Sequence, residues 1–235
     1  MRYILSFILI CGSLLSMAQK PKVNNLQKFD QKIIHFGFAL GINSGGFALQ
    51  RNAYNLTTDS LQNLNVINQS GFNIGIVSDL HIGKLLNLRF IPTLVFGQRN
   101  LEYNFINFKG ERYTVTKEIE STYVDFPILL KYRSVRLNNF AAYFIGGAKY
   151  SLDLASNEAV DNSTIDETVV KLKRSTYSAE VGIGTDFFMQ YFKLGFEIKM
   201  SYSLENALIR YNTEFSNPVE DMRPKMFFFT ILFEG

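Results

Sequence analysis

The sequence predicts an all-β chain that folds as an eight-stranded antiparallel up-and-down transmembrane β-barrel, with long extracellular loops and short periplasmic turns. Three observations predict this fold: an export signal at the start, period-two alternation from residue 33 onward, and connections that alternate between short and long. The 22 Phe and 12 Tyr residues suit strands and membrane interfaces. A soluble β-sandwich is the alternative fold.

Residues 1–18 are predicted to be a cleaved Sec-type signal peptide. A positive charge at Arg2 precedes an apolar run over residues 3–15, and Ser16 and Ala18 place small side chains where a signal peptidase cuts. A lipoprotein signal that uses Cys11 is the alternative. Cleavage after residue 18 removes the only cysteine, so we expect no disulfide, catalytic thiol or Cys-ligated metal in the exported chain.

Residues 19–32 are predicted to be a basic periplasmic N-terminal tail, and residues 33–235 the barrel. The tail carries Lys20, Lys22, Lys28 and Lys32. Such a segment is expected to be disordered and solvated. A grip on a periplasmic partner or on anionic lipid heads is the functional alternative.

The alternation is unusual because the face opposite the large apolar residues is small rather than charged. Over residues 34–43, one face reads Ile, Phe, Phe, Leu, Ile and the other His, Gly, Ala, Gly, Asn. A soluble sheet would place charged groups opposite its apolar face, whereas small groups suit a crowded barrel interior. Seven further segments repeat the pattern, and each is about ten residues long, enough for a tilted strand to cross a bilayer. They are residues 72–83, 86–97, 124–132, 142–153, 177–187, 194–202 and 227–233.

The connections also favour a barrel. Short links are predicted at residues 84–85, 134–138 and 189–191, and long polar links at residues 44–70, 154–172 and 204–222. The third and fourth strands instead continue past the membrane as a hairpin that turns near Lys109 and Gly110. Short periplasmic turns and long outer loops are typical of outer-membrane barrels.

Inward-facing polar residues are predicted to form a structural network that fills the lumen. An eight-stranded barrel is only wide enough for its own side chains, and buried charges persist only when they are paired. The signs are mixed and nearly balanced, which favours filling over the alternatives, a selectivity path or a ligand pocket. The predicted network is His35, Asp79, His81, Arg89, Asp125, Lys131, Lys149, Glu180, Asp186, Glu197 and Lys199.

His35, Asp79 and His81 are the one grouping that could resemble a catalytic or metal site, and we expect them to meet near the periplasmic floor. A barrel hydrolase would also need a serine or a second carboxylate beside the histidine at an accessible rim. We therefore predict no enzyme activity, no catalytic residue, no metal and no cofactor. The acidic loop around residues 158–167 lacks calcium-loop spacing.

The partners predicted from the residues are the outer-membrane bilayer and other proteins. A net charge of +3 argues against nucleic acid, and nothing indicates a small-molecule substrate. The possible protein-contact surface is the long hairpin, with aromatic residues in both arms. These are Tyr103, Phe105, Tyr113 and Tyr123.

Several stretches resemble the PorT/SprT family of outer-membrane barrels from Bacteroidetes. They are residues 88–92 with 96–101, residues 120–132 and residues 142–153, and the cleavage site at Ala18-Gln19 also looks like Bacteroidetes usage. The resemblance implies a component of type IX protein secretion and, in gliding species, of surface-adhesin export. It implies other outer-membrane or periplasmic secretion components as partners, and it carries over no catalytic residues.

Two other functions stay open from the sequence. One is a generic small barrel that acts as an adhesin or envelope stabiliser through its loops. The other is a barrel enzyme or a small-solute channel.

Overall fold

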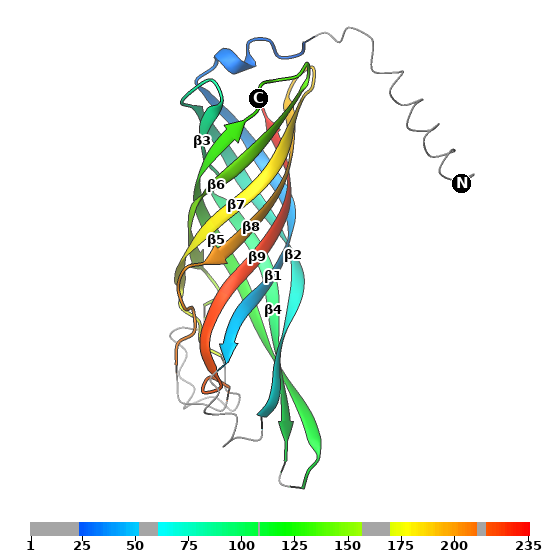
Figure 1. The fold of residues 1–235 in the computed structure, drawn as a ribbon, viewed down its shortest axis with the longest axis vertical. Coiled ribbons are helices and arrows are strands. Elements are labelled where there is room, and N and C mark those ends of the chain that lie inside the picture. Colours follow the sequence, from blue (N-terminus) through cyan, green and yellow to red (C-terminus); the bar gives the residue numbers. More distant parts are fainter. Residues whose placement is uncertain (1–23, 52–60, 108, 157–169, 211–214) are drawn as a thin grey trace, which may run out of the picture.

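The computed structural model describes residues 24–51, 61–107, 109–156, 170–210 and 215–235, and the signal-peptide prediction lies outside these residues. Within them, one antiparallel sheet closes into a ring, because β1 pairs with both β2 and β9 (Figure 1). The strands are β1 (Ile34–Arg51), β2 (Leu61–His81), β3 (Leu86–Phe90), β4 (Thr93–Ile106), β5 (Arg112–Arg133), β6 (Phe140–Asp153), β7 (Ser175–Phe188), β8 (Lys193–Ser203) and β9 (Val219–Glu234). No described helix is long and apolar enough to cross a membrane.

β3 and β4 together form one position of the wall. Both pair with β2 on one side and with β5 on the other. The break between them falls at Ile91 and Pro92, where the proline has no N–H to donate to the ladder, although its carbonyl still accepts from the Ile76 N–H at 3.0 Å. The ring therefore has eight positions, and the predicted eight-stranded antiparallel fold is confirmed.

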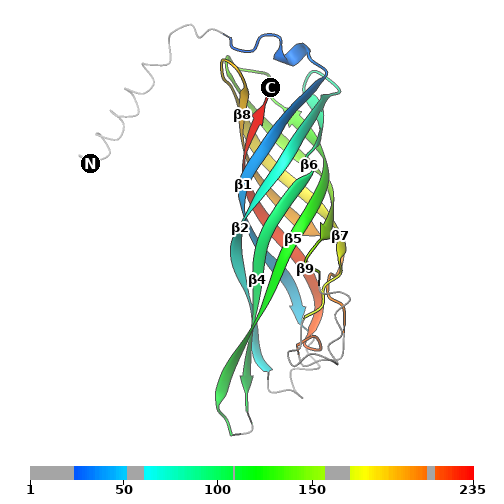
Figure 2. The same ribbon diagram turned by 180° about the vertical axis from the view of Figure 1, so that it is seen from behind.

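The two ends of the barrel differ. One end carries the short connections 82–85, 134–139 and 189–192, and Figure 2 shows the C-terminus and the first described residues there as well. We call it the turn end, and the opposite end the loop end.

Strands replace parts of two predicted loops at the loop end. Residues 44–51 belong to β1, residues 61–70 to β2, and β9 already begins at Val219. The predicted loops 44–70 and 204–222 were therefore too long. The strands continue because β1 keeps pairing with β9 as far as Arg51, and β2 pairs with β4 from Leu61 onward.

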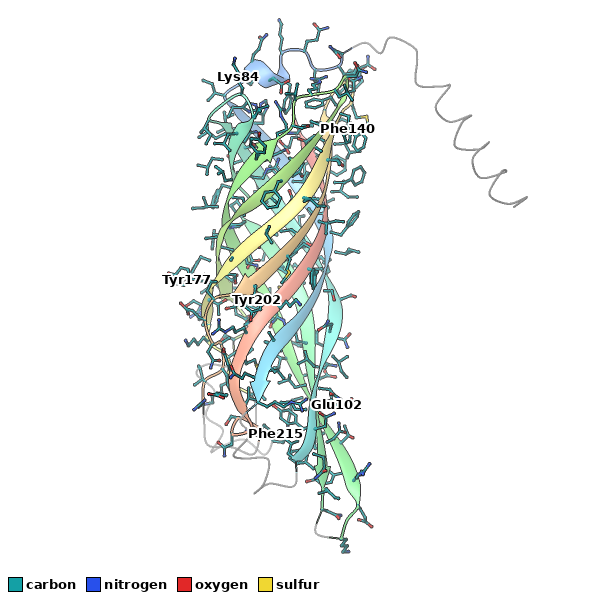
Figure 3. All side chains as sticks on the ribbon, in the orientation of Figure 1. Lys84, Glu102, Phe140, Tyr177, Tyr202 and Phe215 are labelled. Carbon is teal, nitrogen blue, oxygen red and sulfur yellow. The ribbon has the colours of Figure 1, made fainter. Side chains whose placement is uncertain are left out.

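The wall carries its large apolar side chains on the outside. Phe36 is 59% exposed, Ile76 66% and Ile183 60%, whereas the alternating residues face inward and are mostly small or charged. In Figure 3 the side chains of Phe140 near the turn end and of Tyr177 and Tyr202 nearer the loop end lie along this wall. This is the arrangement that a lipid-facing surface requires.

The polarity of the two faces inverts along β4. Its outward residues change from Leu94 to Glu102, while its inward residues change from the buried Arg99 to the fully buried Tyr103. β5 changes in the same way near Tyr123. Large apolar groups face outward on the turn-end side of this level and inward on its loop-end side, so the inversion marks the limit of the apolar outer band toward the loop end.

Beyond this level, toward the loop end, a three-stranded extension projects from the ring, and we call it the blade. It consists of residues 61–68 of β2, 98–106 of β4 and 112–121 of β5. The pairing of β1 with β2 ends at Gln69, and that of β5 with β6 ends at Tyr123, so the blade leaves the ring at these points. Glu102 in Figure 3 lies on it.

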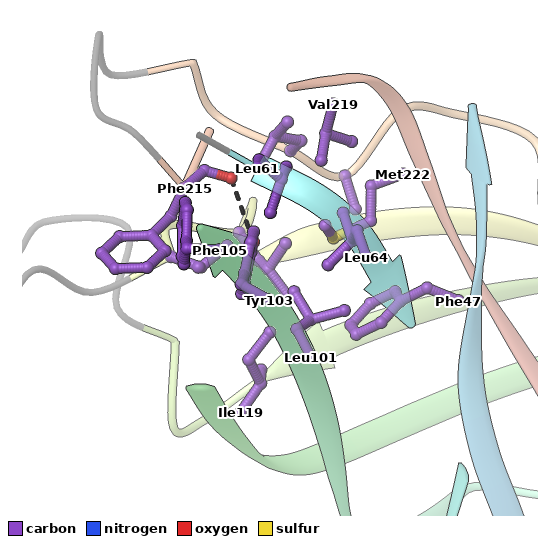
Figure 4. Packing of buried hydrophobic residues seen from close by; sticks show 14 residues of the cluster. Phe47, Leu61, Leu64, Leu101, Tyr103, Phe105, Ile119, Phe215, Val219 and Met222 are labelled. Atoms are coloured by element: carbon purple, nitrogen blue, oxygen red, sulfur yellow. Dashed lines mark hydrogen bonds between the residues drawn. The ribbon is translucent and has the colours of Figure 1, made fainter. Parts of the chain in front are cut away.

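The inner face of the blade packs on a hydrophobic cluster at the loop end (Figure 4). The cluster joins the blade to the ends of β1 and β9 and to the connecting segments. Its members are Phe47, Leu61, Leu64, Leu101, Tyr103, Phe105, Ile119, Val170, Leu172, Ala207, Leu208, Phe215, Val219 and Met222.

Candidate functional site

The lumen nearest the turn end is organised around Arg89 of β3, whose side chain is fully buried. Its guanidinium contacts three carboxylates from three other strands: Asp79 at 2.6 Å, Glu234 at 2.9 Å and Glu197 at 3.1 Å. Charge-assisted hydrogen bonds of this kind are the strong ones. Arg89 thus ties β2, β8 and β9 together across the interior.

Two lysines complete this cluster. Lys131 lies 2.7 Å from Asp186, and Lys193 lies 2.6 Å from Glu234. The Lys131 ammonium also lies 3.9 Å from the centroid of the Tyr143 ring, whose hydroxyl donates to Glu197 at 2.9 Å. Each buried cation therefore has an acidic partner, as burial of charge requires.

A second cluster lies nearer the middle of the lumen. Lys149 contacts Asp125 at 2.8 Å and Glu180 at 3.3 Å, and Lys199 contacts the same glutamate at 2.9 Å. β5, β6, β7 and β8 are joined by these four residues.

Arg99 fills the lumen at the level of the polarity inversion. It donates to the Tyr123 hydroxyl at 2.8 Å and to Ser121 Oγ at 3.0 Å. Its guanidinium also lies over the rings of Tyr123 and Phe47, at 5.0 and 5.2 Å from their centroids. Hydrogen bonds and cation–π contacts thus hold the guanidinium here, and the buried Asp153 carboxylate interacts with it electrostatically.

These contacts involve six basic residues and six acidic ones, and the inward-facing Asp153 adds a further carboxylate near Arg99. The structure places the nine charged residues of the predicted network in these contacts and adds three that sequence reasoning missed, Arg99, Lys193 and Glu234. The strand alternation contained the signal, because Lys193 and Glu234 lie one residue outside the predicted segments 194–202 and 227–233 and continue their alternation on the inner face.

Little space is left between these side chains. The two internal cavities lined by the lumen clusters have volumes of about 20 and about 10 Å³. A single water molecule needs roughly 10–15 Å³. The described side chains therefore fill the lumen and leave room for isolated waters rather than for a ligand or a continuous path.

His35 and His81 meet at the turn end, with ring centroids 5.5 Å apart, and Asp79 lies opposite His35 in the ladder. The Asp79 carboxylate does not bind either ring, because Arg89 and Asn87 Nδ2 (at 2.6 Å) occupy it. The ring nitrogens of both histidines have no hydrogen-bond partner among the described residues. The described residues also hold no group of three or more metal-binding side chains.

The segment before β1 packs across the turn end, and we call residues 24–33 the N-terminal cap. The Phe29 ring stacks on His35 with centroids 3.7 Å apart and meets Phe188 edge-on at 5.8 Å. Asp30 accepts from Arg133 at 2.7 Å. The expectation of a disordered tail is therefore wrong for residues 24–32, because the Phe29 ring is buried against His35 and Phe188 at the end of the lumen. Residues 19–23 lie outside the described part.

The hairpin aromatics proposed as a contact surface are mostly interior. Tyr103, Phe105 and Tyr123 are buried, the first two in the loop-end cluster and the third against Arg99. The Tyr103 hydroxyl donates to the Phe215 carbonyl at 3.0 Å, and burial raises the pKa of Tyr103. Only Tyr113, 47% exposed, offers its ring to a partner, so the predicted surface is corrected to this residue among the four.

The chain matches a known protein family, described as outer membrane protein beta-barrel domain, over residues 17–208. It is similar to the outer membrane protein OprG from Pseudomonas aeruginosa, with a TM-score of 0.44 and 13% identity, covering 86% of this chain and 92% of that one. It is also similar to Ail, the attachment invasion locus protein of Yersinia pestis, solved in complex with the heparin analogue sucrose octasulfate. That match has a TM-score of 0.40 and 13% identity and covers 87% of this chain and 100% of Ail. No curated protein matches the chain significantly.

Proposed function

Because this chain belongs to the outer membrane protein beta-barrel domain family, we propose that it is an outer-membrane subunit of a type IX protein secretion machinery and acts through protein–protein contacts. The observation that carries the proposal is the filled lumen. The paired charges of the described residues occupy the interior and leave no continuous route for a solute between them. The barrel would therefore interact with other molecules through its outer surfaces.

The placement of the stretches that resemble the PorT/SprT family supports the secretion role. Residues 88–101 lie on β3 and β4, residues 120–132 on β5 and residues 142–153 on β6. β5 pairs with β3 and β4 on one side and with β6 on the other, so the stretches form one continuous panel of the wall. A shared panel is what a shared binding partner would contact.

The proposed topology follows the family. The chain is exported by a Sec-type signal peptide cleaved after residue 18, the turn end with its N-terminal cap faces the periplasm, and the blade faces the cell exterior. The partners are the lipid bilayer and other outer-membrane or periplasmic secretion components.

Deletion of the gene tests the secretion role. We expect cargo proteins that carry a C-terminal secretion signal to accumulate in the periplasm, and the full-length chain to restore their export. We also expect the barrel to co-purify from mild detergent with a larger translocon barrel. Normal export in the deletion strain would refute the role.

A second function, an adhesin or envelope stabiliser that acts through its loop end, is favoured by the blade, which projects beyond the apolar outer band. It predicts that the deletion strain exports its cargo normally but adheres less to surfaces or loses resistance to detergent. Removing residues 98–120 while keeping the barrel would then reproduce the loss.

A further inference from the structure

We propose that the outer edge of β5 in the blade, residues 112–120, binds an extended segment of a partner protein by strand addition. The inference rests on the proposed function only in taking the barrel to act through protein contacts. It adds the kind of partner, a polypeptide strand, and the backbone groups that hold it.

β5 is paired along its full length on one side but not on the other. It pairs with β4 from Arg112 to Asp125, whereas β6 reaches only as far as Tyr123. The last backbone bond on the β6 side among the described residues runs from the Leu154 N–H to the Thr122 carbonyl, at 2.8 Å. Beyond it the described part of the chain provides no ladder for this edge.

The unpaired backbone groups can be assigned from this last bond. Successive residues of an antiparallel strand direct their N–H and C=O groups to opposite neighbours. Because the Thr122 carbonyl points away from β4, the even-numbered residues before it do so too. They are Arg112, Thr114, Thr116, Glu118 and Glu120.

The two edges of the blade differ in how far other groups of the chain cover them. On the β2 edge, the Arg51 guanidinium donates to the Leu64 carbonyl and to Asn63 Oδ1, at 2.5 and 2.9 Å. The β5 edge has exposed side chains at Thr114 and Thr116, no proline and no register shift in its pairing with β4. Covering groups, prolines, bulges and charged side chains are the devices that normally prevent an edge from pairing with another strand. Of these, the described β5 edge carries only charges, so it selects a partner by charge. The charged residues are Arg112, Glu118, Glu120 and the inward-facing Lys117.

The side chains of the edge define the incoming strand. Glu118 and Glu120 lie on the outer face and are exposed, and on the opposite face Tyr113 is 47% exposed. Opposite charges and apolar groups stabilise directly facing positions in antiparallel pairs. The partner segment is therefore an antiparallel strand with basic residues opposite the two glutamates and an apolar residue opposite Tyr113.

A second copy of this chain does not fit the edge within one membrane. The blade continues in the direction of the barrel axis, as Figure 1 shows. Two β5 edges can continue one antiparallel sheet only when their strands point in opposite directions, which would also point the two barrels in opposite directions. Copies inserted into the same membrane share one orientation, so the occupant is a segment of a different protein.

Residue-resolved amide hydrogen exchange on the full barrel in detergent micelles tests the proposal. The probe is a synthetic peptide of the same length as residues 112–120, in which Lys or Thr alternates with Val. Without the peptide, the amides of residues 114, 116, 118 and 120 should exchange fast and their odd-numbered neighbours slowly. With the peptide at about ten times its dissociation constant, the even-numbered amides should slow by about tenfold.

Two variants make the test specific to the backbone. Thr116→Pro removes one N–H of the free edge and no bond to β4, so the barrel should fold but lose peptide affinity by about tenfold or more. Thr116→Val keeps the N–H and should bind as the parent does. Protection of the odd-numbered amides in Thr116→Pro verifies that the blade is intact. A peptide with Glu in place of Lys should bind about tenfold more weakly.

Three results would overturn the proposal. Slow exchange at the even-numbered amides before peptide is added would mean that the chain itself occupies the edge. Peptide binding without their protection would place the peptide elsewhere, and unchanged binding by Thr116→Pro would exclude strand addition. Because the cargo-export test does not involve the peptide, failure of the secretion role is distinguishable from failure of this inference.

Discussion

Arg89 shows how single residues hold the interior together. A buried guanidinium loses its hydration, and the three carboxylates of Asp79, Glu197 and Glu234 restore the lost interaction. Each of these carboxylates belongs to a different strand, so the contacts resist separation of the wall. Asp79 and Glu197 were predicted from the strand alternation, whereas Glu234, one residue past the last predicted segment, was not. The mutual distances could not be predicted, because these depend on the stagger of the strands around the ring.

Removal of the Arg89 charge should destabilise the barrel strongly. Arg89→Met keeps most of the side-chain volume but leaves three buried carboxylates less compensated, so we expect a loss of about 3–5 kcal/mol. Urea unfolding in lipid vesicles measures it. Arg112→Met, at an exposed position on the blade, is the control and should change the free energy of unfolding by less than about 0.5 kcal/mol. Equal effects of the two variants would contradict the central role of Arg89.

Phe29 should hold the N-terminal cap in place. Its ring is buried between His35 and Phe188, so Phe29→Ala removes the stacking contact and most of the apolar area that fixes the segment. We expect the amides of the cap to exchange faster while those of β1 do not change. Exchange measured by mass spectrometry on peptic fragments checks this. Lys32→Ala, an exposed change in the same segment, should leave both rates unaltered.

Among the elements, β2, β4 and β5 each run through two environments, the apolar outer band and the blade. The part of β4 nearer the turn end presents Leu94 outward, and the part nearer the loop end presents Tyr103 inward and Glu102 outward. The alternation of apolar and polar residues could therefore be read from the sequence as strand over its whole length. The extra length of β1 and β2 could not, because residues 44–51 and 61–70 lack the run of large outward residues by which the wall was recognised.

The position of the apolar outer band can be tested on a single strand. Ile76 lies within the band on β2, and Ile67 lies on the same strand in the blade. Ile76→Arg should cost about 2–4 kcal/mol in lipid vesicles, whereas Ile67→Arg should cost less than about 1 kcal/mol. Unfolding titrations of both variants provide the comparison. Similar losses at both positions would mean that the band does not end at the polarity inversion.

At the scale of the whole molecule, the closed ring and its filled interior determine whether ions or solutes can pass through the barrel. The export signal, the alternation and the connection lengths together predicted the closed ring, and the inward-facing residues predicted a near balance of charge. The N-terminal cap was not predicted from the sequence. The residues around Phe29 show no periodic pattern, and Phe29 and Asp30 contact strand ends that are far apart in the sequence.

Deletion of residues 24–33 should not make the barrel conduct ions. The cap covers the turn end, but the clusters around Arg89 and Lys149 fill the lumen beneath it. We therefore expect no steady conductance in planar bilayers from either the parent or the deletion variant. A large stepwise conductance in the parent would refute the filled lumen, and its appearance only in the deletion variant would assign the seal to the cap.

The pairing of β1 with β9 also constrains the timing of assembly. The seam joins the first strand to the last, and Glu234, the penultimate residue, is the acceptor for both Arg89 and Lys193. Until β9 pairs with β1, the sheet keeps two open edges, and Arg89 and Lys193 lack the Glu234 carboxylate as an acceptor. Closure of the ring and neutralisation of these buried cations are therefore coupled in one step of folding.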